Sequence, residues 1–320
     1  MPIKKYTGIK SLLLSIFILG LAVGCQTNKT ASSLPLSIIY GHKDEGNKAI
    51  YLSDEEGKIR VKVVDAPVSN TIGYPAVSPT GKQIAFYSKY DKRRTWSIHT
   101  ADIDGSNIRR LTNVKNVWDS APAWSTDGKT IIFAREYEDV NEGWREEIWL
   151  MNADGTEQRQ IRSLQGRAAE FMQDGRILFQ SKASPSQISI ANIDGSNVIQ
   201  LTDDESNNMS PKISPDGLQI AYLSNRDGNQ EVYVMNIDGS NHKRLTRNRV
   251  EEWDPAWSTD GAKVFFSSQN VYGFYDIYKV NKDGSSIKKV LNSGSQAATV
   301  FHIDKSYLER FFKTRQQYKQ

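Results

Sequence analysis

The chain has 320 residues, 38% of them hydrophobic and 24% charged, which is enough apolar material for one large β domain or two ordinary domains. This hydrophobic content excludes a disordered chain, and a mean hydropathy of −0.55 excludes a polytopic membrane protein. The 41 basic and 37 acidic side chains give a net charge of +4. The single cysteine, Cys25, excludes an intramolecular disulfide framework and any multi-thiolate metal site.

Residues 1–24 have the pattern of an export signal. Lys4, Lys5 and Lys10 precede an apolar run of about 13 residues, shorter than the roughly 18 to 20 residues that a membrane-spanning helix needs. Cys25 directly follows Gly24, and this junction resembles a bacterial lipobox, although Leu21 stands one position earlier than usual. The resemblance implies a diacylated Cys25 that anchors the protein to a membrane. Cleavage by an ordinary signal peptidase and retention as a membrane anchor are the alternatives.

The export signal changes the interpretation of the charge. Removal of the three lysines leaves 38 basic and 37 acidic side chains, a net charge of +1, and the repeats show no basic stripe. Nucleic acid is therefore not an expected partner. Residues 25–36 are polar and Ser/Thr-rich, as expected of a flexible tether. Gln26 is not an aspartate, so no Asp-type retention signal is evident, and we expect the periplasmic side of the outer membrane if the organism is Gram-negative.

The strongest pattern after residue 37 is an internal repeat. One signature, of the type PAWSTDGK, has glycines 42 to 47 residues apart, at Gly81, Gly128, Gly175, Gly217 and Gly261. A second signature, of the type MNIDGSN, has glycines 40 to 50 residues apart, at Gly105, Gly155, Gly195, Gly239 and Gly284. β-Branched and aromatic residues alternate between these Asp-Gly turns, which is a strong hairpin signal. Each repeat of about 45 residues is therefore predicted to form four antiparallel strands, one blade of a β-propeller.

The number of repeats predicts an all-β, six-bladed propeller over residues 37–306. Complete blades begin at Pro75, Pro122, Ala169, Pro211 and Pro255, and residues 37–64 supply three strands of another. TVFHIDKS at 299–306 aligns with PAWSTDGK, with Phe301 at the place of Trp124. We therefore predict that this C-terminal strand completes the N-terminal blade and removes the exposed sheet edges. Residues 307–320 are predicted to be a tail.

The PAWSTDGK and MNIDGSN repeats resemble the TolB-type β-propeller repeat, which also occurs in the propellers of prolyl oligopeptidase-like peptidases. The resemblance covers about residues 37–306 and implies a protein-binding platform at the cell envelope. Residues 25–37 leave no room for the α/β domain that precedes the TolB propeller, and the hydrolase domain of the oligopeptidases is also missing. A propeller-only lipoprotein is therefore expected.

Motifs of catalysis and metal binding were sought in the same repeats. The sequence has no G-x-S-x-G elbow, no H-E-x-x-H and no phosphate-binding glycine-rich loop. The histidines lie in different blades and at different repeat positions: His42, His99, His242 and His302. The stretch from Asp102 begins like an EF-hand loop, but its glycine comes too early, so a β-turn in which Asp and Asn bond their own backbone is expected. No catalytic residue, metal site or cofactor is predicted.

Most aromatic residues recur at fixed repeat positions, and we predict that they pack between blades. One set lies on innermost strands (Trp124, Trp257, Phe171 and Phe301) and another on third strands (Trp149, Tyr51, Tyr233 and Tyr278). Two Trp-Asp pairs differ, because they precede innermost strands in the loops between blades. These loops share a face with the loops between second and third strands, where aromatic and charged residues are typical of recognition surfaces. The predicted partner-binding residues are Trp118, Asp119, Trp253, Asp254, Trp144, Tyr137 and Arg94. The alternative is that these residues cap the loops and contact one another.

These patterns favour a monomeric, non-catalytic envelope lipoprotein that binds a protein or peptide. A receptor for a glycan or small ligand in the central funnel is the first alternative, because tryptophans and carboxylates on loops suit sugar stacking equally well. A propeller-type lyase or hydrolase, with a site assembled from distant blades, is the second.

Overall fold

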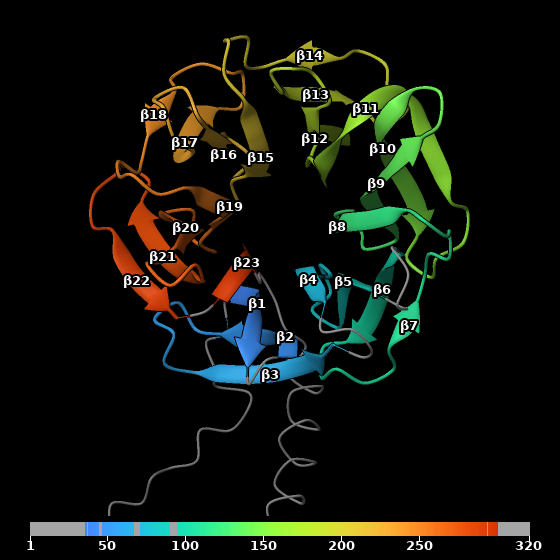
Figure 1. Cartoon of the computed structure of the whole chain (residues 1–320), viewed down its shortest axis with the longest axis horizontal. Coiled ribbons are helices and arrows are strands. Elements are labelled where there is room, and N and C mark those ends of the chain that lie inside the picture. The colour runs from blue at the N-terminus through green and yellow to red at the C-terminus, as the bar shows by residue number, and fades with distance from the viewer. Residues whose placement is uncertain are drawn as a thin grey trace, which may run out of the picture.

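The computed structural model describes residues 36, 38–44, 47–66, 71–89, 95–292 and 294–299. Every regular element in these ranges is a strand, which confirms the all-β prediction. Figure 1 shows the sheets arranged around a common centre. The predicted signal, Cys25, most of the tether and the C-terminal tail lie outside the described residues. Among the described residues there is no helix able to cross a membrane.

Three four-stranded sheets and one eleven-stranded sheet make up the described part of the chain. The first has the order β23(Gly294–Thr299)-β1(Ile38–Asp44)-β2(Asn47–Ser53)-β3(Arg60–Asp65). Two others run in chain order, β15(Asn208–Ile213), β16(Gln219–Ser224), β17(Glu231–Asn236), β18(Lys243–Arg244) and β19(Glu252–Trp257), β20(Lys263–Gln269), β21(Tyr275–Asn281), β22(Lys288–Leu291).

The eleven-stranded sheet contains three successive groups of strands. The first group is β4(Ile72–Val77), β5(Gln83–Lys89), β6(Trp96–Asp102) and β7(Arg109–Arg110), and the second is β8(Trp118–Trp124), β9(Thr130–Asp139), β10(Gly143–Asn152) and β11(Arg159–Phe171). The third adds β12(Arg176–Ser181), β13(Ile188–Asn192) and β14(Ile199–Gln200). The 13 residues of β11 pair with β10 at one end and with β12 at the other, so this strand joins two groups into one sheet.

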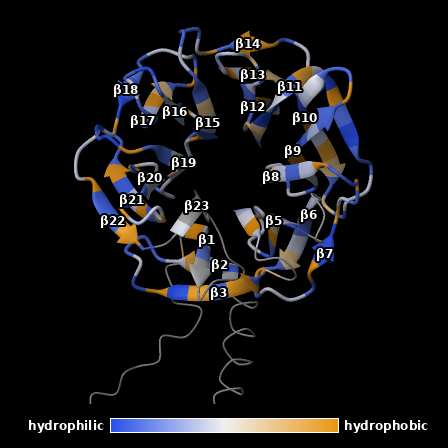
Figure 2. Cartoon of the chain, in the orientation of Figure 1, coloured by the Kyte–Doolittle hydropathy of each residue, from blue (hydrophilic) through white to orange (hydrophobic). Residues whose placement is uncertain are grey.

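The Asp-Gly turns form as the sequence predicts. At 102–107 the Asp104 carboxylate accepts a hydrogen bond from the Ser106 backbone N–H at 3.0 Å, and Asp102 accepts one from the Asn107 amide at 2.8 Å. Gly105 has a φ of +82°, and a Cβ there would lie 1.7 Å from the carbonyl oxygen of Val63. Only glycine fits this close approach of two backbones. Figure 2 shows hydrophobic and hydrophilic residues along the strands that these turns connect.

The strand that pairs with β1 lies earlier than predicted. The sequence prediction placed it at 299–306, whereas β23 covers 294–299 and aligns Ile38 with Thr299 and Gly41 with Ser295. The aromatic match of Phe301 was misleading, and Phe301 lies outside the described residues. Glycine is needed at position 294 of β23 because a Cβ there would lie 2.8 Å from Cδ1 of Ile277 and 3.1 Å from Cδ2 of Tyr40.

Trp124 and Trp257 of the innermost strands pack between neighbouring groups, as predicted. The Trp124 indole N–H donates a hydrogen bond to the Ala76 carbonyl at 3.0 Å, and the Trp257 indole N–H donates one to the Lys212 carbonyl at 3.0 Å. Each of these bonds ties one innermost strand to the preceding one. The third-strand residues Trp149, Tyr51, Tyr233 and Tyr278 all belong to, or pack against, hydrophobic clusters.

Candidate functional site

The connections between successive strand groups lie beside the hairpins that join second and third strands. The backbone N–H of Trp96 donates to Val117 O at 3.1 Å, and that of Glu252 donates to Gln230 O at 3.0 Å. These contacts place both kinds of loop on one face, as the sequence analysis expected. We name this face the loop rim; its described residues are 111–119, 139–145, 182–187, 203–208, 225–230, 247–253 and 270–275.

Trp118 and Asp119 lie at the loop rim but in a strand, so the prediction that they belong to the loop before the innermost strand is wrong. They are the first two residues of β8. Trp118 stacks on Trp96 with ring centroids 5.1 Å apart. Asp119 is fully buried, and its carboxylate accepts hydrogen bonds from Arg135 Nε at 2.7 Å and Nη2 at 2.9 Å. A carboxylate held by two nitrogens of one guanidinium stabilises the sheet and does not face a partner.

Trp253 and Asp254 occupy different repeat positions from Trp118 and Asp119. Counted from the proline that follows in each innermost strand, Asp119 corresponds to Glu252. Trp253 and Asp254 are the second and third residues of β19, so their predicted position in a loop is also wrong. Trp253 is 39% exposed on the loop rim. Asp254 has a φ of +51° and lines the central cavity. The two Trp-Asp pairs are therefore not equivalent in the repeat. Glu252, the true counterpart of Asp119, was not predicted as a site residue, although alignment of the repeats on their prolines identifies it.

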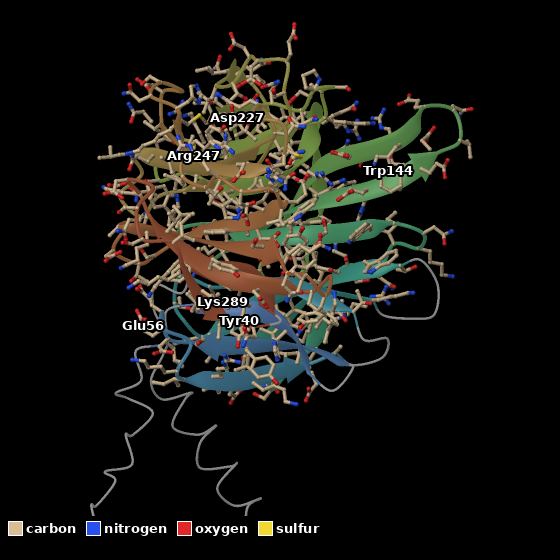
Figure 3. All side chains as sticks on the ribbon, turned by 60° about the vertical axis from the view of Figure 1, so that its left-hand side comes forward. Tyr40, Glu56, Trp144, Asp227, Arg247 and Lys289 are labelled. Carbon is tan, nitrogen blue, oxygen red and sulfur yellow. The ribbon has the colours of Figure 1, made fainter. Side chains whose placement is uncertain are left out.

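The β9–β10 hairpin presents the other predicted residues. Figure 3 shows Trp144 on this hairpin, on the opposite side of the view from Glu56 of the β2–β3 connection. Trp144 is 47% exposed. The Tyr137 hydroxyl donates to Glu147 Oε1 at 2.8 Å, and this bond raises the pKa of Tyr137. Arg94 lies outside the described residues.

The loop rim and the opposite face of the strands differ in the kind of large apolar side chain that they expose. On and beside the loop rim four exposed aromatic residues accompany aliphatic ones: Trp144, Trp253, Tyr272 and Phe274, with Val114, Val140, Val250 and Val271. On the opposite side of the strands the described exposed residues of this kind are aliphatic: Ile108, Ile193, Val198, Ile199, Leu218 and Ile287. Exposed aromatic residues are enriched in recognition surfaces, so the loop rim is the candidate binding face.

A cavity of about 470 Å³ lies where the innermost strands meet. Five innermost strands each contain the Pro or Ala that begins a repeat, and each has a β-bulge there. The residue directly before that Pro or Ala has a positive φ: Tyr74, Ala121, Ala168, Ser210 and Asp254. All five line the cavity. Two charged residues of the cavity lining, Lys212 and Glu170, pair with each other, with Lys212 Nζ 2.5 Å from Glu170 Oε1. The Glu170 carboxylate also accepts a hydrogen bond from the Ile213 N–H at 3.2 Å.

A second hollow, of about 710 Å³, opens beside the β20–β21 hairpin. Its lining includes Tyr272 and Phe274 at the mouth, Phe266 and Tyr278 on the strands, and Glu252. Burial raises the pKa of Glu252 to about 7, and the nearby Glu231 carboxylate adds to this rise. We name this hollow the β19–β22 cleft.

The described residues contain no group of three or more His, Cys, Asp or Glu side chains positioned to hold a metal ion. His99 is buried, stacks on Phe86 at 5.6 Å and hydrogen-bonds the Ser97 carbonyl through Nδ1 at 2.9 Å. His242 contacts the Tyr222 hydroxyl at 2.8 Å. Each of these histidines therefore has a structural role within the sheets.

Repeated four-stranded units around a central cavity, with one loop rim rich in exposed aromatic residues, define a β-propeller. The model of the TolB beta propeller domain matches residues 37–225, and that of the Tricorn protease N-terminal beta propeller domain matches residues 184–320. The chain belongs to the TolB beta-propeller family.

Solved structures of TolB proteins are similar to this chain. TolB from Acinetobacter baumannii is 22% identical with a TM-score of 0.71, over 82% of this chain and 66% of that one. A TolB from Agrobacterium tumefaciens is 21% identical with a TM-score of 0.63, over 82% of this chain and 92% of that one. An uncharacterized peptidase, YuxL of Bacillus subtilis, is 24% identical over 151 residues, which are 47% of this chain and 21% of that protein. The chain thus spans about a fifth of this relative and about two thirds of the first.

Proposed function

We propose that the protein is a non-catalytic platform that binds a protein or peptide partner through its loop rim. The observation that supports this most is the concentration of exposed aromatic side chains on that rim, where Tyr272 is 81% and Trp144 47% exposed. Large, stiff aromatic side chains on well-ordered loops bury much area at little entropic cost. Of the residues predicted from sequence, Trp253 and Trp144 are exposed on this face. Tyr137 lies beside it on β9, and Trp118 and Asp119 are held in β8.

The platform is proposed to be a closed six-bladed ring. The pairing of β23 with β1, and the contacts that β23 makes with β19 and β4, support a closure by the C-terminal strand. A closed ring leaves no innermost sheet edge unpaired, and each blade is then held by two neighbours. Such a base keeps the rim loops in place before a partner arrives.

We place the protein at the cell envelope, held by a lipid on Cys25 and a tether over residues 25–36. The lipobox-like junction and the family support this placement. Metabolic labelling with an alkyne fatty acid tests it. The intact chain should incorporate the label, and Cys25→Ser should not; labelling of the variant would contradict the anchor.

A receptor for a glycan or small ligand is the second candidate, and the central cavity favours it. Its volume of about 470 Å³ is in the range of small-ligand sites. Trp124 and Trp257 line it, and Asp254 contributes a carboxylate. Soluble glycan fragments that shift the Trp fluorescence of the wild type but not of a Trp257→Phe variant would support this role.

Site-directed photo-crosslinking in cells tests the platform. A photoreactive phenylalanine at Tyr272 should give a discrete crosslink to a protein. The same group at Leu218, which is 63% exposed on the opposite side, is the matched control and should give none. Crosslinks of equal yield at both positions would contradict a partner site on the loop rim.

A further inference from the structure

The β19–β22 cleft contains a buried carboxylate, Glu252, that forms no ion pair with any described lysine, arginine or histidine. Glu252 is fully buried, and its Oε2 has no hydrogen-bond partner among the described residues. Oε1 accepts a hydrogen bond from the Asn248 side chain, and Ser268 also forms a hydrogen bond with the Glu252 carboxyl. Charged residues are almost never fully buried without a partner, so this carboxylate at the wall of an open cleft calls for an explanation.

In the second strand group (β8–β11), the acidic residue at the same repeat position has an arginine as its partner. Asp119 stands opposite Arg135 across β8 and β9. The guanidinium of Arg135 makes its two bonds to Asp119 and lies over the facing aromatic rings of Trp149 and Phe133, at 4.3 and 5.6 Å from their centroids. A guanidinium in this place is thus bonded on its edge and stacked on its face.

The β15–β18 sheet repeats this arrangement with a different arginine. Arg226 Nη2 donates to Asn208 Oδ1 at 3.0 Å, and Asn208 is the counterpart of Asp119 in the proline frame. The guanidinium lies 5.0 Å from the Tyr233 ring centroid and 5.9 Å from that of Tyr222. Two independent arginines therefore reach the same place relative to an aromatic pair and a polar side chain.

The β19–β22 sheet has the aromatic pair and the acid, but Ser268 stands where Arg135 stands in the second group. Phe266 and Tyr278 stack at 5.7 Å, and Glu252 faces Ser268 across β19 and β20. All four residues line the cleft. Among the described residues no arginine lines this cleft, whose lining includes the exposed Tyr272 and Phe274.

The other charges at the cleft do not replace the missing guanidinium. Lys289 lies opposite Tyr278, as Arg244 lies opposite Tyr233, and its Nζ is 5.7 Å from the Tyr278 ring centroid. This ammonium is bonded to Asp276 at 2.8 Å and not to Glu252. Glu231 is bonded to Arg244 at 2.9 Å, and both Glu231 and Glu251 raise the pKa of Glu252. With Lys289 and Asp276 neutralising each other, the lining carries the single negative charge of Glu252 when that group is ionised.

We infer that the β19–β22 cleft is a binding site for the guanidinium group of an external ligand, which takes the place that Arg135 and Arg226 fill in the neighbouring sheets. Glu252 accepts the edge N–H groups, and Phe266 and Tyr278 provide the stacking face. The aliphatic stem of the ligand lies between Tyr272 and Phe274. The site stands independently of whether the loop rim binds a protein.

Isothermal titration of the full chain with N-acetyl-arginine N-methylamide tests the site. The arginine probe should bind saturably, and the citrulline analogue, which has the same shape without the charge, should bind at least about tenfold more weakly. Agmatine distinguishes the two possible sources of the guanidinium group, a free small molecule and an arginine side chain of a peptide. Tighter binding of agmatine than of the peptide-like probe indicates a free guanidine, and weaker binding indicates a peptide side chain. Equal affinity for the arginine and citrulline probes would overturn the inference.

Two variants link this binding to the geometry. Glu252→Gln keeps the shape and should lower the affinity for the arginine probe at least about tenfold. Ser268→Arg copies the second group, so it should abolish probe binding and raise the urea midpoint of unfolding. Ser88→Arg is the matched control, because Ile72 stands opposite Ser88 and offers no carboxylate; it should lower the midpoint. Unchanged probe affinity in Glu252→Gln would refute the site.

Discussion

Replacement of Asp119 by alanine tests whether this residue acts in stability, as the structure indicates, instead of in binding. The Asp119 and Arg135 side chains are 1% and 6% exposed and share two hydrogen bonds. Loss of the carboxylate leaves a buried guanidinium without its counter-charge, since Trp149 and Phe133 supply only their ring faces. Breaking a buried ion pair in this way costs about 3–5 kcal/mol of the free energy of unfolding.

Urea denaturation of single and double variants measures this cost. Asp119→Ala should lower the free energy of unfolding by about 3–5 kcal/mol, whereas Asp119→Leu combined with Arg135→Met should lie within about 1 kcal/mol of the wild type, because no charge is then buried alone. Asp65→Ala is the control: Asp65 pairs with Lys62 on the surface, with side chains 69% and 32% exposed, and its loss should cost under about 1 kcal/mol.

The reasoning would be refuted if Asp119→Ala cost as little as Asp65→Ala. The guanidinium of Arg135 would then be hydrated in solution. Partner binding by Asp119→Ala, measured below its unfolding temperature, should match that of the wild type.

Three further predictions concern pH and closure. Burial raises the pKa of Glu252 to about 7, so the folded state binds this proton more tightly than the unfolded chain does. As the pH rises from about 4.5 to 7, the stability that this group contributes should therefore fall by about 3 kcal/mol. The urea midpoints of Glu252→Gln should lack this decline. His99 has its pKa lowered by burial to about 4, so its contribution is lost as pH falls from about 6.5 to 4, by about 3 kcal/mol; a His99→Gln variant with the same acid midpoint as wild type would contradict this. Deletion of residues 294–320 exposes the β1 edge and should cause aggregation or loss of cooperative thermal unfolding; a truncated chain that melts normally would exclude closure by β23.

The repeat made most of the fold predictable, because alternation and Asp-Gly turns act locally and recur. The strand that pairs with β1 was misplaced because Gly294 gives no hydrophobic signal, and a Cβ at this position would lie too close to Ile277 and Tyr40. The position of Phe301 in a repeat-like stretch was the stronger, misleading pattern.

The candidate site was harder to predict, because it depends on contacts across strands. Nothing near Asp119 in the sequence indicates that Arg135, 16 residues away, would bury its carboxylate. Glu252 was hidden by the apparent match of two Trp-Asp pairs that occupy different positions in the proline frame. The missing arginine opposite Glu252 is visible only when the neighbouring sheets are compared in register.

Quantitative capture from envelope extracts tests the central claim most directly. The full chain is compared with a loop-rim variant (Trp144→Ser, Trp253→Ser, Tyr272→Ser) and with an opposite-side variant (Ile108→Ser, Val198→Ser, Leu218→Ser), all six positions being at least 39% exposed. The account predicts that the same partner is captured by the wild type and the opposite-side variant and is lost from the loop-rim variant, with equal melting temperatures. Retention of that partner by the loop-rim variant would contradict the account.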